Sequence, residues 1–473
     1  MRWLFAPLLL LVFSPWSFAE SRTSVEAYQL ENGLGVLFKP TRDKGYVSIR
    51  LVVGVGFSDF ACRDRQLPHL MEHLFFSGLD GGDEADLEAR MQALGGQWNA
   101  FTSEGDTTFV IEVPAATQRQ ALDLLLEALT RTHLDPARIE ATKQVLVRED
   151  GGRYSHLQRM LDHQNVSRGG QEQLAVELGL ACSERAQVAQ LTQAQLQKLR
   201  SDWYVPGNMT LIAVGDLDPR LPAYLSRTFG SLPAHDIPER RDLPEMKGPA
   251  QRERTLTTGL FGEGALVHWI FAEPGEADGA ALDLLQAYFN DLLYSDLRVH
   301  HELSYGPWSE RAAYANQGFF SLNADIERED QAKTVQALHR LVDDIRQHGL
   351  DAQRFSRVQR AQRAQLAWST PGNAALADYY WGALGDFDGE QFPSEDRRLA
   401  KVTLQQVNDV ARQLFKDEGY LRIERPLLDD DTAYPLALGA LVLMAALLML
   451  GYLLLRRRIA RRTLRRLTAA ASE

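Results

Sequence analysis

Strand-like and helix-like patterns alternate through the first half of the chain. Short runs of β-branched and aromatic residues, bounded by turn residues, predict strands at 33–39, 46–53, 97–102 and 107–113. Apolar residues at helical spacing predict one helix from an N-cap at Asp83 to a stop at Gly95-Gly96, and another over 118–131. Asp135-Pro136 supplies an N-cap and a first-turn proline for a further helix that runs to about Asp150.

The same order of patterns recurs after a stretch that has no periodicity. Residues 234–253 hold three prolines and many charges, which is typical of an interdomain linker. Beyond it come an apolar run at 265–271, a helix at 279–293, strands around 318–325 and helices at 331–348 and 351–368. This weak internal repeat predicts an α+β protein with two homologous domains, at 24–233 and 254–427, each an α/β sandwich of an antiparallel sheet packed with helices.

Both ends of the chain carry membrane-directed signals. Residues 1–19 have the charge, apolar run and small-residue site of a signal peptide, with an uncleaved N-terminal anchor as the alternative. Residues 436–455 are uncharged and long enough to span a bilayer, and a basic tail follows at 456–473. The positive-inside rule then predicts a single-pass protein of the cytoplasmic (inner) membrane with its body on the periplasmic side. A buried core helix is the other interpretation of 436–455.

Charge and cysteine content narrow the choice of partners. The 473 residues carry a formal net charge of -12, and the tail after Leu455 holds seven Arg and one Glu, so the rest of the chain carries -18. An acidic body argues against nucleic acid as a partner. The two cysteines, Cys62 and Cys182, would enter a compartment that permits a disulfide, but the sequence leaves open whether they meet.

The candidate chemistry lies in the segment 67–76. On a helix His69 and His73 stand one turn apart on the same face, with Glu72 beside them. Neutral imidazoles are good zinc ligands, and a carboxylate next to a metal-bound water can take its proton. This His-x-x-Glu-His order is the inverted zincin motif. The plainer interpretation is an amphipathic helix with two surface histidines.

Two histidines alone do not hold a catalytic zinc, and Glu149, on the helix predicted after Pro136, is the candidate third ligand. The motif, then Gly95-Gly96-x-x-Asn99-Ala100-x-Thr102-Ser103, then Val145-Leu146-Val147-Arg148-Glu149, resembles the insulinase/pitrilysin family of zinc metallopeptidases, closest to the processing-peptidase type. The resemblance implies that Glu149 completes the zinc site. It also implies that Asn99 and Ala100 lie on an edge strand that pairs with the substrate backbone.

A second segment of the resemblance lies in the second half of the chain. Residues 297–305 resemble the family's Leu-Arg-x-x-x-x-Leu-x-Tyr segment, which implies that Arg298 and Tyr305 bind substrate and steady the oxyanion. The alternative is a helix-terminal arginine and a half-buried tyrosine. Two departures stand out: Gln66 replaces a usual glycine, and Thr142 stands where relatives often have a second carboxylate.

The sequence thus predicts a zinc-dependent endopeptidase with one Zn2+ per chain, acting on peptides or unfolded polypeptides. Glu72 takes the proton of the attacking water and later returns it to the leaving amine. The resemblance implies a closed chamber built from two such chains, so we expect a homodimer or a paired family subunit. The rival hypotheses are a catalytically silent relative that serves as a membrane-anchored binding or assembly subunit, and an unrelated membrane-anchored binding module.

Overall fold

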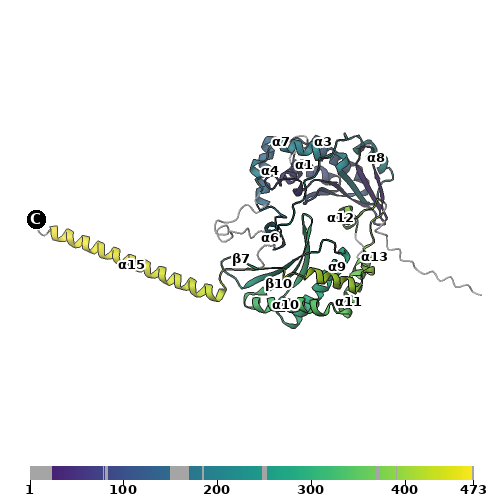
Figure 1. Ribbon diagram of the computed structural model, residues 1–473. Helices are drawn as coiled ribbons and strands as arrows, with labels where there is room; N and C mark the ends of the chain where they lie inside the picture. Colours follow the sequence, from purple (N-terminus) through teal and green to yellow (C-terminus); the bar gives the residue numbers. More distant parts are fainter. Residues whose placement is uncertain are drawn as a thin grey trace, which may run out of the picture.

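The computed structural model describes residues 24–77, 79, 82, 84–149, 170–183, 186–247, 253–368, 372–389 and 391–470. The expected signal peptide, the N-cap at Asp83, Asp150 and part of the expected linker lie outside these residues. Within them the chain forms two sheets, each covered by helices, and a long helix that projects from the second sheet (Figure 1). The protein is therefore a mixed α/β molecule with two layered units.

The first sheet has six strands in the order β1-β2-β6-β3-β5-β4. Its strands are β1 (Glu26–Gln29), β2 (Gly35–Pro40), β3 (Tyr46–Val53), β4 (Gln97–Thr102), β5 (Thr107–Pro114) and β6 (Met209–Gly215). Along β3, Val47, Ile49, Leu51 and Val53 point into the main core, whereas Ser48, Arg50 and Val52 point to the opposite face. Both faces of β3 are buried, so both must be covered.

Helices cover the inner face of this sheet, which is the face that carries Val47, Ile49, Leu51 and Val53. They are α1 (Leu67–Ser77), α2 (Glu84–Ala93), α3 (Gln118–Arg131), α4 (Pro136–Glu149), α7 (Gln193–Trp203) and α8 (Leu221–Arg227). The bounds of α3 are those that its leucine spacing predicts. Short 3-10 turns η1 (Phe57–Asp59), η2 (Ala115–Thr117), η3 (Val188–Gln190), η4 (Pro206–Asn208) and η5 (Phe229–Ser231) connect the elements.

The second sheet has five strands in the order β7-β11-β8-β10-β9. They are β7 (Glu253–Thr257), β8 (Gly264–Ala272), β9 (Trp308–Tyr314), β10 (Gln317–Glu327) and β11 (Tyr420–Arg425). Besides α12 and α15, which are described below, this half contains α9 (Gly279–Leu293), the π-helix η6 (Tyr294–His300), α10 (Gln331–His348), α11 (Ala352–Trp368), α13 (Glu395–Lys401), α14 (Leu404–Leu414) and the turns η7 (Arg328–Asp330) and η8 (Leu384–Asp386). The predicted helices at 279–293 and 331–348 have these bounds.

The sheets are mostly antiparallel, as predicted, but each contains one parallel pair of strands. In the first sheet β2 pairs in parallel with β6, and in the second β7 pairs in parallel with β11. The other strand pairs are antiparallel. Long connections explain the difference, because a strand that returns after a long excursion can lie in either direction beside its neighbour.

The two halves exchange one helix each. Helix α6 (Gly170–Glu177) follows the first half in sequence, but Leu174 and Ala175 pack on the outer face of the second sheet, against Ile270 and Phe319. In return α12 (Asn373–Gly382), from the second half, covers the outer face of the first sheet with the buried side chains Leu376, Ala377 and Tyr380 on Leu37, Val52, Ile212 and Val214. Each sheet is thus completed by the other half of the chain.

Polar contacts reinforce the seat of α12. Arg50, 2% exposed, donates to Asp378 at 2.8 Å and to Glu112 at 2.9 Å. Thr41 donates its hydroxyl to the side chain of Asn373 at 2.7 Å. Because a buried guanidinium without acceptors would be costly, these contacts fix how α12 lies on the sheet.

Helix α15 (Asp430–Ala470) leaves the second half directly after β11 and runs away from the body (Figure 1). Its segment Asp430–Arg461 is long and apolar enough to cross a membrane, with a mean hydropathy of 2.5. None of its most apolar stretch is buried against the rest of the protein. The interpretation of 436–455 as a buried core helix is therefore wrong.

Candidate metal centre

Helix α1 presents two imidazoles because its apolar residues occupy the other faces. Its buried residues, which include Leu70, Met71, Leu74 and Phe75, pack into the main core. His69 and His73 fall on the remaining, partly exposed side, one turn apart. Their Nε2 atoms lie 3.2 Å from each other.

Helix α4 brings a carboxylate to the same place. It packs along α1 through a buried side that includes Ile139 and Leu146, and Glu149 is its last residue. The Oε2 atom of Glu149 lies 3.5 Å from His69 Nε2 and 3.3 Å from His73 Nε2. The three atoms form a nearly equilateral triangle.

A tetrahedral zinc ion fits this triangle. Bonds of about 2.0–2.1 Å at the tetrahedral angle would place the ligand atoms roughly 3.3–3.4 Å apart, and the three distances are 3.2, 3.3 and 3.5 Å. Three protein ligands leave a fourth position for water, as in catalytic zinc sites. In the part of the chain that the structure describes, these residues form the one group of three or more His, Cys, Asp or Glu side chains close enough to hold a metal.

The protonation of His69 suits metal binding. Burial lowers the pKa of its imidazole and His73 lowers it further, while Glu149 opposes both, so the net pKa lies below its ordinary value. A neutral imidazole is the form that binds a metal. His69 Nδ1 lies 2.9 Å from Gln66 Oε1, which can only accept, so Nδ1 carries the proton and the lone pair of Nε2 points to His73 and Glu149.

Glu72 lies on α1 between the two histidines and is 7% exposed. Burial raises the pKa of its carboxyl, the Thr102 hydrogen bond and His73 lower it, and Glu149 raises it, with a net increase. Thr102, the last residue of β4, donates its hydroxyl to Glu72 Oε2 at 2.6 Å. A buried carboxyl whose pKa is raised holds a proton more readily and is therefore suited to accept and return one.

Asn99 and Ala100 lie on β4, which is the last strand of the first sheet. Their partners on β5 are Val110 and Phe109, and no described strand pairs with the other edge of β4. Asn99 is exposed and Ala100 is 7% exposed. An unpaired edge strand ending at Thr102, beside Glu72, can accept an extended peptide as an additional strand.

Arg298 and Tyr305 lie at and just after the π-helix η6 in the second half. The Arg298 guanidinium stands 4.3 Å from the centre of the Tyr305 ring, and both residues line a cavity of about 850 Å3. Tyr305 is 78% exposed, so the alternative interpretation of a half-buried tyrosine is wrong. Among the described residues no hydrogen bond, ion pair or ring contact joins this pair to His69, His73 or Glu149.

Sequence reasoning missed two contacts of this centre. Gln66 stood out only as a departure from a family pattern, and Thr102 only as part of a motif. The spacing of Gln66, three residues before His69, is a signal that could have been used, because residues three apart on a helical turn are neighbours. The contact of Thr102 with Glu72 joins residues 30 positions apart and depends on the tertiary fold.

Fold and site together define a two-unit α/β protein with the ligand set of an inverted zincin. Residues 36–182 match the model of the Insulinase (Peptidase family M16) family, and residues 190–362 match the model described as Peptidase M16 inactive domain. The chain belongs to the insulinase family of zinc proteases, Peptidase family M16.

Relatives of known sequence or structure agree with this assignment. The uncharacterized zinc protease YmxG of Bacillus subtilis is 20% identical over 409 residues, which cover 85% of this chain and 98% of that protein. A protease from Helicobacter pylori has a similar structure, with a TM-score of 0.67 and 18% identity, covering 85% of this chain and all of the other. The periplasmic protease PqqL from Escherichia coli superposes with a TM-score of 0.69 and 19% identity, covering 87% of this chain and 48% of PqqL.

Proposed function

We propose that this protein is a zinc-dependent endopeptidase whose metal is held by His69, His73 and Glu149. The observation that carries the proposal is the triangle of ligand atoms, whose sides match a tetrahedral zinc site. The zinc protease relatives support the same cofactor. We propose one Zn2+ per chain, because the described residues form one group that could hold the ion. Zinc bound there would lower the pKa of a water molecule and polarise the peptide carbonyl.

The residues around this position can carry the remaining steps. Glu72 takes the proton of the attacking water and gives it to the leaving amine, because burial raises the pKa of its carboxyl and a carboxyl with a raised pKa is a better proton acceptor and can later act as the acid. The open edge of β4, with Asn99 and Ala100, aligns the peptide backbone by adding it as a strand. Peptides and unfolded polypeptides are the substrate class that this mode of binding favours.

Arg298 and Tyr305 complete the site from a second copy of the chain. A cation and a phenol donor stabilise the negative charge that develops on the carbonyl oxygen. Since no contact among the described residues joins this pair to the metal ligands, we infer a homodimer in which each chain supplies the pair for its partner's metal centre. A paired family subunit in place of the second copy is the alternative.

The location proposed for this enzyme is the cytoplasmic membrane, with the body on the periplasmic side. Helix α15 supports a single crossing, and its basic end supports a cytoplasmic tail. The periplasmic relative PqqL supports the same side for the body. The domain limits that accompany the proposal are 24–233 for the metal-binding domain and 254–427 for the domain that carries Arg298 and Tyr305.

The test uses the full chain in detergent, as wild type and as Glu72→Gln. We expect both proteins to hold zinc and only the wild type to cleave a quenched-fluorescent peptide library, with a loss of about 10²–10⁴-fold in the variant. Glu84→Gln, on the exposed first turn of α2, serves as the matched control and retains activity. Zinc without cleavage in the wild type would favour the catalytically silent binding subunit, and absence of zinc would refute the metal centre.

A further inference from the structure

The imidazole of His69 is held from the segment that precedes its helix. Residues 57–66, here called the pre-α1 segment, contact the ring at two points. Gln66 Oε1 lies 2.9 Å from Nδ1, and the ring of Phe57 meets the imidazole edge-on with centroids 6.1 Å apart. The side chain of Gln66 therefore decides which nitrogen carries the proton, and Phe57 limits how the ring can turn.

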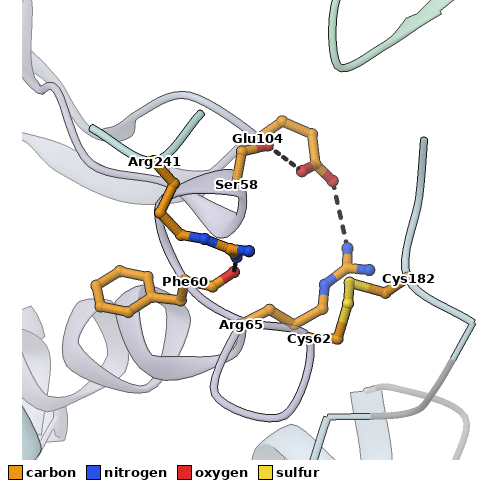
Figure 2. Close-up of a disulfide and its surroundings, with 7 residues drawn as sticks. All are labelled: Ser58, Phe60, Cys62, Arg65, Glu104, Cys182 and Arg241. Carbon is orange, nitrogen blue, oxygen red and sulfur yellow. Dashed lines mark hydrogen bonds and ion pairs between the residues drawn. A yellow bond between two sulfur atoms is a disulfide. The ribbon is translucent and has the colours of Figure 1, made fainter. Parts of the chain in front are cut away.

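The pre-α1 segment is itself fixed at several places (Figure 2). The Cys62–Cys182 disulfide joins it to the chain that follows α6. Arg65 donates to the Glu104 carboxylate at 3.3 Å, and Ser58 donates to the same carboxylate at 2.7 Å. On the side of the linker, Arg241 donates to the carbonyl oxygen of Phe60 at 2.5 Å.

The disulfide is the covalent one of these attachments and lies near Gln66 in sequence. The backbone N–H of Gln187 also donates to the carbonyl oxygen of Arg63 at 2.8 Å, beside the bridge. Cys62 lies four positions before Gln66, and α1 begins at Leu67. The covalent bridge thus limits how far the residue that contacts His69 can move.

We propose that Gln66 is a positioning residue of the metal centre, which keeps the Nε2 lone pair of His69 aimed at the ion, and that the Cys62–Cys182 disulfide holds Gln66 in place. The proposal rests on the proposed zinc site. If His69 lost this acceptor, its proton could move to Nε2 and bond Glu149, and metal binding would then require the ring to change tautomer first.

The experiment measures the zinc dissociation constant of the full chain by competition with a chromogenic chelator. Gln66→Met removes the acceptor at similar size, and we expect binding about 10–100-fold weaker. Gln66→Glu keeps an acceptor and restores the wild-type affinity or better. Gln92→Met, an exposed glutamine on α2, is the matched control and leaves the affinity unchanged. Equal affinities for Gln66→Met and the wild type would overturn the role of Gln66.

The role of the disulfide is tested in the same assay with a double-mutant cycle. Cys62→Ser/Cys182→Ser replaces the bridge without a thiol reductant, which would bind zinc itself. We expect this pair to weaken zinc binding, and Gln66→Met to add little in its background, because both changes act through one contact. Full additivity would overturn the link between bridge and Gln66. Unfolding of the zinc-free proteins monitors stability, and a wild type that binds no zinc would refute the proposed function instead.

Discussion

Two inactive variants should restore activity when they are combined in one dimer. Glu72→Gln removes the proposed proton acceptor at the metal centre, and Tyr305→Phe removes the proposed hydroxyl donor of the Arg298–Tyr305 pair in the second half. Loss of one oxyanion donor costs about 10²–10³-fold in rate, so each homodimer should be nearly silent. In a mixed dimer, the intact metal centre of the Tyr305→Phe chain faces the intact Tyr305 of the Glu72→Gln chain.

The magnitude follows from the geometry of the exchange. A mixed dimer has one composite site with both defects and one with neither, so it should show about half of the wild-type rate per dimer. The two variants are co-expressed with different affinity tags, purified through both tags in sequence and assayed on the same peptide. Activity no higher than that of the silent homodimers would refute the shared site, because a site built within one chain carries a defect in both subunits.

Three further predictions concern stability. Replacing Cys62 and Cys182 by Ser opens a loop with a sequence separation of 120 residues, which should cost about 5 kcal/mol in the zinc-free protein by chain entropy; an unchanged denaturant midpoint would contradict this. Leu376→Ala on α12 should cost about 2–5 kcal/mol in thermal unfolding, while Leu243→Ala at an exposed site should be neutral. Burial opposes ionisation of Glu424, but His268 and Arg422 lower the pKa of its carboxyl below the ordinary 4.5. The ionised Glu424 carboxylate therefore stabilises the fold above pH 4.5, and this stabilisation is lost as the pH falls through the pKa of the carboxyl in the folded state. With Glu424→Gln, the free energy of unfolding from urea denaturation should fall less steeply in acid than in the wild type. An equal fall in both proteins would refute the pairing.

The local sequence pattern predicts the helices whose apolar residues recur at helical spacing. Tertiary contacts determine how these helices and the strands are arranged. The helices expected over 118–131 and 279–293 occur with those bounds, since their apolar residues recur at helical spacing. No sequence pattern predicts the exchange of α6 and α12. The apolar face of a helix indicates that the helix packs on a sheet, but not which of the two sheets it is. The parallel pair β2 and β6 was missed for the same reason.

The candidate site divides in the same way. A single helix sets the spacing of His69 and His73, so their proximity can be derived from five residues. The approach of Glu149 depends on how α4 packs on α1, and the sequence pointed to it only through a family resemblance. Whether Cys62 and Cys182 meet was open from sequence, and the structure joins them across 120 positions.

The exchange of α6 and α12 affects the order in which the protein can fold as it is synthesised. The first sheet is complete once Gly215 has been synthesised, but α12, which covers its outer face, begins only at Asn373. Until then Leu37 and Ile212 remain on an open apolar surface. The nascent chain therefore exposes this apolar surface while residues 216–372 are synthesised, and such a surface is a binding site for a holding chaperone until α12 covers it.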